Sequence, residues 1–180
     1  MKIAVIGFSG GGKSTLARRL GELYGVEVLH LDTVHHLSGW KSRLREESRA
    51  MVEAFLNTHD TSGWVIDGNY GKLAYDRRME EADRIVMLLL NRLDCLQRVC
   101  RRYRTYRGSS RPDMTEGCRE KLDAAFIRWI LYEGRRGEQR ALLQKVMRLY
   151  KNKLVCLRSQ RDIDRYWEQC TAAEALPAKE

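Results

Sequence analysis

The residues best suited to chemistry lie near the amino terminus, in a run of glycines that ends in lysine, serine and threonine. Residues 7–15 read GFSGGGKST and fit the pattern G-x-x-x-x-G-K-[ST] in full. A glycine-rich backbone of this kind wraps a polyphosphate with its N–H groups pointing inward, and the start of the following helix adds partial positive charge. The alternative is a glycine-rich turn with a surface lysine. We expect an ATP-binding loop, formed by Gly7, Ser9, Gly10, Gly11, Gly12, Lys13, Ser14 and Thr15.

Two side chains of this loop and two aspartates have the chemistry of phosphoryl transfer. Lys13 would reach the terminal phosphates, and the Ser14 hydroxyl would be a ligand of Mg²⁺. Asp67 follows the third expected strand and would hold the same Mg²⁺ directly or through water. Asp32 follows the second expected strand and would accept a proton from the attacking acceptor group, or orient that group. For both aspartates the alternative is a helix or turn cap.

Three of the four histidines, His30, His35 and His36, lie within seven residues beside Asp32. A metal site is one interpretation, but the spacing matches no familiar pattern of metal ligands. The sequence favours a polar loop that binds the acceptor.

The positive charge of the chain is concentrated in one segment. The net charge is +9, and residues 98–112 contain six arginines with no lysine and no acidic residue. A guanidinium group binds phosphate oxygens with two parallel hydrogen bonds and stabilises the charge that spreads in the transition state of phosphoryl transfer. A Gly-Ser-Ser-Arg-Pro loop at 108–112 follows, as in a closing lid. The alternatives are a solvated helix face and, because Tyr103 and Tyr106 lie between the arginines, a nucleic-acid contact.

Short apolar runs alternate with helical periods along the chain, which predicts strands separated by helices. The expected strands are 2–7, 26–29, 64–66, 84–90 and 154–157. The expected helices begin near Lys13, at Asp94, near 122, near 142 and at Ser159, and another is marked by residues 44–56 and ends near Asn57. We expect a frayed tail from Thr171. Strands that are buried on both faces and joined by helices indicate a parallel sheet with right-handed crossovers, so the fold class is α/β.

Length and composition restrict the protein class further. A chain of 180 residues can bury a core as a single domain, residues 1–180. The longest apolar run, 85–90, is far shorter than the roughly 20 residues of a membrane span, so we expect no membrane partner. The five cysteines include no C-x-x-C pair, which favours a reduced, cytoplasmic protein.

Several segments together resemble a known family. Besides the loop at 7–15, these are 29–32 (LHLD), 64–70 (WVIDGNY), the arginine helix, and above all 110–118 (SRPDMTEGC). The chain is similar over almost its whole length to the bacterial DNA topology modulation proteins of the FlaR type. They are an adenylate-kinase-like branch of the P-loop kinases.

The resemblance implies a P-loop NTPase fold of three α/β/α layers. Its sheet would have five parallel strands in the order 2-3-1-4-5, with an acceptor-binding insert near 33–62 and a helical lid near 102–120. Asp67-Gly68 would take the place of the Asp-Gly pair of adenylate kinases, with Arg98 and Arg102 as lid-base arginines. In true adenylate kinases that pair is followed by Phe-Pro-Arg, which helps to bind a monophosphate, whereas here Asn69-Tyr70-Gly71 follows.

The function predicted from the sequence is therefore an ATP- and Mg²⁺-dependent phosphotransferase, a kinase, acting as a monomer or homodimer. Its catalytic residues would be Lys13, Asp32, Asp67, Arg98 and Arg102, and Ser14 and Asp67 would hold the metal. The acceptor would be a small molecule, with nucleotides and nucleosides among the candidates. Two alternatives are a nucleotide-dependent regulator that binds DNA and modulates its topology, and an ATPase without an acceptor.

Overall fold

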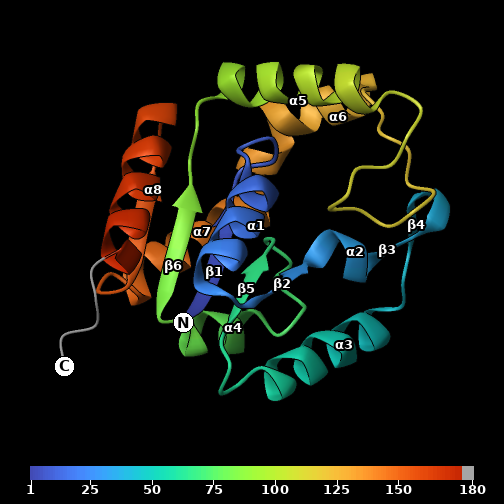
Figure 1. Ribbon diagram of the computed structural model, residues 1–180. Coiled ribbons are helices and arrows are strands. Elements are labelled where there is room, and N and C mark those ends of the chain that lie inside the picture. Colours follow the sequence, from blue (N-terminus) through green and yellow to red (C-terminus); the bar gives the residue numbers. More distant parts are fainter. Residues whose placement is uncertain (176–180) are drawn as a thin grey trace, which may run out of the picture.

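A five-stranded parallel sheet forms the centre of the molecule (Figure 1). The structure is a computed structural model, and it describes residues 1–175. The sheet comprises β1 (Lys2–Gly7), β2 (Glu27–His30), β5 (Trp64–Asp67), β6 (Arg84–Leu88) and β7 (Leu154–Leu157), in the spatial order β2-β5-β1-β6-β7. These strand labels differ from the predicted order 2-3-1-4-5, because β3 and β4 form a separate hairpin that the prediction did not include and that takes two numbers in the chain. Counted within this sheet alone, the order along the chain is second, third, first, fourth, fifth.

The helices cover both faces of the sheet, an arrangement compatible with three α/β/α layers. Alternating residues of β1 separate the two faces: Ile3 and Val5 belong to one apolar cluster, and Ala4 and Ile6 to the other. The first cluster is completed by α1 (Lys13–Tyr24), α5 (Arg92–Tyr106), α6 (Ala124–Leu131) and α8 (Gln160–Ala175). The second is completed by α2 (Leu31–His35), α3 (Arg45–Thr58), α4 (Tyr75–Glu81) and α7 (Gly137–Leu149).

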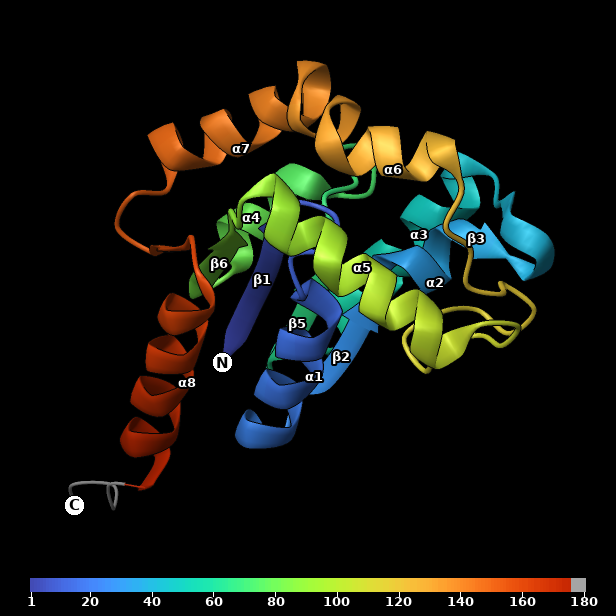
Figure 2. The ribbon, with the colours of Figure 1, turned by 90° about the horizontal axis from the view of Figure 1, so that it is seen from above.

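The strand register places the ends of three strands side by side. His30 at the end of β2 is paired with Asp67 at the end of β5, and Asp67 is also paired with Val5 of β1. Helices α5 and α6 lie across these carboxyl ends (Figures 1 and 2). In an open parallel sheet this edge is where ligands bind.

The insert at 33–62 contains more structure than its sequence indicates. After α2, a short antiparallel pair of β3 (His36–Leu37) and β4 (Lys41–Ser42) flanks a single 3₁₀ turn, η1 (Ser38–Trp40). The prediction missed α2, this hairpin and α4, because each is too short to show a period in the sequence.

The predicted helical lid is wrong in one respect, because residues 107–123 form turns and an isolated bridge rather than a helix. Helix α5 ends at Tyr106 and α6 begins at Ala124, so the helices flank the lid. We use lid segment for residues 107–123. Its backbone meets the hairpin: Gly39 N–H donates to the Gly117 carbonyl at 3.3 Å, and the Trp40 indole N–H donates to the Arg119 carbonyl at 2.9 Å. The lid segment and the insert are therefore in contact.

The ends of two helices also differ from expectation. Asn91, not Asp94, caps α5: its side chain accepts a hydrogen bond from the Asp94 backbone N–H. At the other end of the chain, α8 continues to Ala175, so the prediction of a frayed tail is wrong for residues 171–175, and residues 176–180 lie outside the described residues. The remaining 3₁₀ turn, η2 (Glu133–Arg135), joins α6 to α7. Among residues 1–175, no helix has both the length and the apolar composition needed to cross a membrane.

Candidate nucleotide and acceptor site

The glycine-rich loop connects β1 to α1 with a backbone that glycine alone adopts easily. Gly7, Gly10 and Gly12 have φ values of 132°, 77° and 94°. A Cβ on Gly7 would overlap the carbonyl oxygen of Leu88, and a Cβ on Gly10 would lie 2.7 Å from the Cys95 carbonyl oxygen. The loop thus requires glycine for both its φ angles and its close packing. This leaves a bare backbone turning into the first turn of α1, which contains no acidic residue.

Asn69 holds the start of the loop from the neighbouring strand. Its side-chain oxygen accepts a hydrogen bond from the Gly7 N–H at 2.9 Å, and its side-chain NH₂ donates to the Gly7 carbonyl at 2.7 Å. Gly7 is also near the next strand, because Phe8 N–H donates to the Leu88 carbonyl at 2.9 Å. The loop is therefore fixed to β5 and β6 where it leaves β1.

Lys13 begins α1 with its side chain folded back over the loop. Its ammonium Nζ donates to the Phe8 carbonyl at 3.2 Å. Burial lowers the pKa of Lys13, and the charges of Asp67 and Asp32 act in the opposite direction. An ammonium group without a close carboxylate partner in such a place is suited to bind an incoming anion.

The two predicted aspartates lie at the strand ends with different partners. Asp67 is buried and its Oδ1 lies 2.7 Å from His30 Nδ1. Burial opposes the charged form of His30, but the hydrogen bond to Asp67 and the nearby acidic charges raise its pKa above the usual value. Asp32, in the first turn of α2, accepts a hydrogen bond from the Tyr70 hydroxyl at 2.7 Å. Its side chain is 43% exposed, which leaves it accessible from the cavity.

Arg111 of the lid segment stands at the centre of a buried charge network. It is 8% exposed and forms ion pairs with Asp32 at 3.6 Å, Asp113 at 3.4 Å and Glu120 at 3.2 Å. Glu120, which is also buried, binds Arg102 of α5 at 2.6 Å. The network ties the lid segment to α5 and to Asp32 in α2.

Asp113 is the residue of the lid segment that lies near the glycine-rich loop. The Ser14 side chain, one of the predicted metal ligands, is near enough to its carboxylate to contribute to lowering the pKa of Asp113. Burial alone would raise the pKa of Asp113, but Arg111 and the contact with Ser14 outweigh it and the pKa lies below its usual value. A third carboxylate thus lines the cavity together with Asp32 and Asp67.

The lid-base arginines contact the loop and the lid. Arg98 Nη1 donates to the Gly11 carbonyl at 2.9 Å, and Nη2 donates to the side-chain oxygen of Gln160 at the start of α8. Arg102 is directed to Glu120 instead, and burial together with the neighbouring Arg111 lowers its pKa. Arg98 therefore supports the loop, and Arg102 holds the lid segment.

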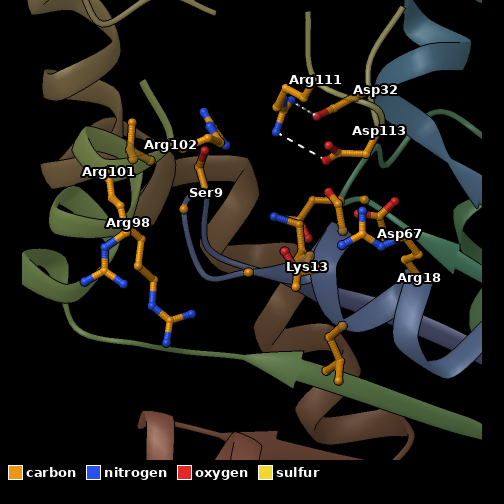
Figure 3. A pocket seen from close by; sticks show the side chains of 18 of the residues that line it. Ser9, Lys13, Arg18, Asp32, Asp67, Arg98, Arg101, Arg102, Arg111 and Asp113 are labelled. Atoms are coloured by element: carbon orange, nitrogen blue, oxygen red, sulfur yellow. Dashed lines mark ion pairs between the residues drawn. The ribbon is translucent and has the colours of Figure 1, made fainter. Parts of the chain in front are cut away.

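A cavity of about 820 Å³ joins these groups (Figure 3). The predicted site residues that line it are Ser9, Gly10, Gly12, Lys13, Ser14, Thr15, Asp32, Asp67, Arg98 and Arg102. Gly7 and Gly11 are the two predicted residues that do not line it; Gly7 serves the shape of the loop, and Gly11 receives Arg98. The volume is in the range of ordinary ligand sites.

Sequence reasoning missed several residues of the site. Arg111 was predicted only as one of the six lid arginines and His30 only as part of an acceptor-binding loop, so the carboxylate partners of both were missed. Asp113 was placed in the lid without a role, and Glu120 and Asn69 had no role assigned. Only Asn69 had a signal in the sequence, because it follows Asp67-Gly68 at the end of a strand. Glu120 and Arg111 are nine residues apart in an irregular segment, so no periodicity could have paired them.

The donor set decides what kind of ion the site suits. Among the described residues, no group of three or more His, Cys, Asp or Glu is arranged to hold a metal ion by itself. His30 is paired with Asp67 rather than grouped with His35 and His36 as ligands. A hydroxyl and carboxylates beside the glycine-rich loop are the kinds of donor that Mg²⁺ uses when it is held jointly with substrate phosphates.

Comparisons with known proteins bear on the fold alone. No protein-family model matches the chain, and no curated protein sequence matches it. A crystal structure described as an uncharacterized protein from Eubacterium ventriosum is similar, with 14% sequence identity and a TM-score of 0.51. The similarity covers 97% of this chain and 98% of the other. The two chains share an architecture over their full length.

Proposed function

We propose that this protein is a cytoplasmic, ATP-dependent phosphotransferase of the adenylate-kinase-like branch of the P-loop kinases, related to the FlaR-type proteins. The observation that carries the proposal is the loop at 7–15. Three of its four glycines have positive φ, its backbone leads into a helix, and Lys13 lies in a cavity that also contains carboxylates. The strand order within the sheet, counted along the chain, is the one expected of that branch.

The residues of the loop would hold the triphosphate. Backbone N–H groups of 9–15 and the Lys13 ammonium would bind phosphate oxygens, and Ser14 with Asp67 or Asp113 would hold Mg²⁺ directly or through water. When bound, Mg²⁺ neutralises the charge that develops on the phosphate oxygens.

Asp32 would act on the acceptor. The Tyr70 hydroxyl and Arg111 hold its carboxylate toward the cavity, where it would take the proton of an acceptor hydroxyl. The remaining catalytic effect would come from positioning and from charge stabilisation under the lid segment.

The arrangement of the arginines supports a transferase over a DNA-binding regulator. Of the six arginines at 98–112, Arg98 binds the loop backbone, and Arg102 and Arg111 bind a buried carboxylate within the protein. Half of the local excess of positive charge is therefore directed inward. A DNA-binding face would instead present these groups to phosphates in solvent.

The experiment is a screen for ADP release that depends on an added acceptor. We expect wild-type protein with Mg²⁺·ATP to release ADP faster with one class of hydroxyl compound. In Asp32→Asn, the turnover of that compound should fall by about 10²–10⁴-fold with ATP affinity unchanged. Asp60→Asn, at an exposed aspartate outside the site, is the matched control. ADP release that no acceptor accelerates would contradict the proposal and would indicate an ATPase.

A further inference from the structure

One arginine that does not line the cavity rests on the glycine-rich loop. Arg135 lies in η2, the turn that joins α6 to α7, and its guanidinium carbon is 3.9 Å from the centroid of the Phe8 ring. A guanidinium group at this distance from an aromatic ring makes a cation–π contact. Phe8 occupies the first open position of the loop pattern, where the pattern requires no particular side chain. The loop therefore has a contact that its motif does not account for.

Three elements fix the guanidinium group of Arg135 in place. Its Nε donates to the Ile130 carbonyl of α6 at 3.0 Å, and its Nη1 donates to the Leu90 carbonyl, which follows β6, at 3.0 Å. Its Nη2 donates to the Cys95 Sγ of α5 at 3.2 Å. Each guanidinium nitrogen thus has a partner, so the group cannot turn away from the Phe8 ring without losing hydrogen bonds.

Phe8 in turn orders the backbone that would receive the phosphates. Its N–H donates to the Leu88 carbonyl at 2.9 Å. Its carbonyl accepts hydrogen bonds from the Gly11 N–H at 3.1 Å and from Lys13 Nζ at 3.2 Å. Because both donors bind the same carbonyl, a displacement of Phe8 would displace a backbone N–H of the loop together with its ammonium group.

The same arginine joins the loop to the helix that follows the lid segment. The lid segment ends at residue 123, and α6 begins at Ala124 and packs along α5 (Figure 2). Arg135 holds the end of α6 through the Ile130 carbonyl, and it holds the loop through Phe8. The end of α6 that is distant from the lid segment is therefore fixed on the glycine-rich loop.

We propose that Arg135 is a positioning residue of the nucleotide site, which acts through Phe8 to hold the glycine-rich loop in its binding geometry. The inference rests on the proposed phosphotransferase function, which assigns no role to Arg135. Its effect is indirect, because neither Arg135 nor Phe8 is among the residues that line the cavity. Arginine suits this place better than lysine, since a planar guanidinium group can face a ring and donate to three acceptors at once.

The experiment is a double-mutant cycle between Arg135 and Phe8. Calorimetry with Mg²⁺ and a non-hydrolysable ATP analogue is carried out on wild type, Arg135→Met, Phe8→Leu and the double variant. Arg135→Met should lower the affinity by about three- to thirtyfold, which corresponds to the loss of one cation–π contact. In the Phe8→Leu background the same substitution should lower the affinity by less than about twofold, because the ring through which Arg135 acts is gone.

Two outcomes of the cycle would overturn the proposal. An equal loss of affinity in both backgrounds would indicate that Arg135 acts through its charge alone. An unchanged affinity in folded Arg135→Met would indicate a role in stability only. Arg136→Met is the matched control and should leave the affinity unchanged, because Arg136 is exposed and its guanidinium carbon lies 6.0 Å from the Tyr132 ring centroid. If Arg135→Met does not fold, Arg135→Lys replaces it with the same expected pattern, since an ammonium group keeps the charge without the planar contact.

Amide hydrogen exchange without nucleotide separates this inference from the proposed function. Exchange in a peptide spanning 7–15 should be at least about threefold faster in Arg135→Met than in wild type or Arg136→Met, because the N–H groups of Phe8 and Gly11 are hydrogen-bonded only while the loop is held. Unchanged exchange would overturn the role of Arg135, whether or not the analogue binds. Wild type that binds no analogue would instead refute the proposed function, and the exchange measurement would still show whether Arg135 positions the loop.

Discussion

Asn69 offers a direct test of how the glycine-rich loop is held. The side chain makes two hydrogen bonds to one residue, accepting from the Gly7 N–H at 2.9 Å and donating to the Gly7 carbonyl at 2.7 Å. Each such bond contributes about 1 kcal/mol net. Asn69→Ala should therefore lower the free energy of unfolding by about 2 kcal/mol, which for a chain of this size lowers Tm by about 4–8 °C.

The same change should weaken nucleotide binding, because the loop would no longer be held in its binding geometry. If binding must first restore the loop geometry at a cost of the full 2 kcal/mol or so, the affinity for nucleotide falls by at most about thirtyfold, since about 1.4 kcal/mol corresponds to a factor of ten. The assays are urea and thermal unfolding, together with calorimetry using a non-hydrolysable ATP analogue. Asn152→Ala, at an exposed asparagine in the turn before β7, is the matched control.

Asn69→Asp sharpens the test, because it keeps the acceptor for the Gly7 N–H and replaces the donor with a carboxylate oxygen facing the Gly7 carbonyl. Protonation restores a donor there, so the folded-state pKa of the introduced carboxyl should be raised. This variant should therefore approach the wild-type free energy of unfolding at low pH and lose stability as the pH rises through that raised pKa. The reasoning is refuted if Asn69→Ala matches Asn152→Ala in both unfolding and nucleotide affinity.

Three further predictions concern the same elements. Glu120→Gln leaves buried Arg111 and half-buried Arg102 each short of a charge partner and should cost about 3–5 kcal/mol in urea unfolding; a loss below 1 kcal/mol would contradict the network. The pKa of His30 is raised in the folded protein, so the stability that its charged form contributes is complete below about pH 6.5 and is lost as the pH rises through that pKa. The difference in free energy of unfolding between wild type and His30→Gln should therefore narrow between pH 6 and 9. A difference that widens over this range would contradict the prediction. Gly7→Ala should prevent folding, because φ is 132° and the added Cβ would overlap the backbone of Leu88. Gly25→Ala, where φ is 61° and no atom lies within 4 Å of the added Cβ, should lower the free energy of unfolding by only about 1–2 kcal/mol. Equal effects of the two substitutions would contradict the close packing around Gly7.

The sequence predicted the parts of the fold that depend on local signals. The strands around Val5, Val65 and Val86 are short apolar runs buried on both faces, and each was found within two residues of its expected end. The capping pair Ser159 and Asp162 also forms as expected, with Asp162 N–H donating to the Ser159 hydroxyl at 3.2 Å. Such features require only neighbouring residues, and so a single sequence reveals them.

The parts that were missed depend on contacts between distant segments. The excess of arginine between 98 and 112 predicted a lid that closes on phosphates. The acidic partners of these arginines lie outside that segment, at Asp32 in α2 and at Asp113 and Glu120 in the lid segment. Similarly, His30 is recognisable as a partner of Asp67 only when the register of β2 and β5 is known. Composition therefore located the charged segment but could not determine whether its charge remained free.

The central claim, that residues 7–15 bind the triphosphate of ATP, is tested most directly by calorimetry on Lys13→Ala. The titrant is the non-hydrolysable ATP analogue with Mg²⁺, and Lys151→Ala, at an exposed lysine in the turn before β7, is the control. Lys13 provides the loop's ammonium group, and its Nζ donates one hydrogen bond among residues 1–175, to the Phe8 carbonyl, so its loss should leave the fold intact. We predict that wild type and Lys151→Ala bind the analogue and that folded Lys13→Ala shows no measurable binding. Equal affinity in all three proteins would contradict the account.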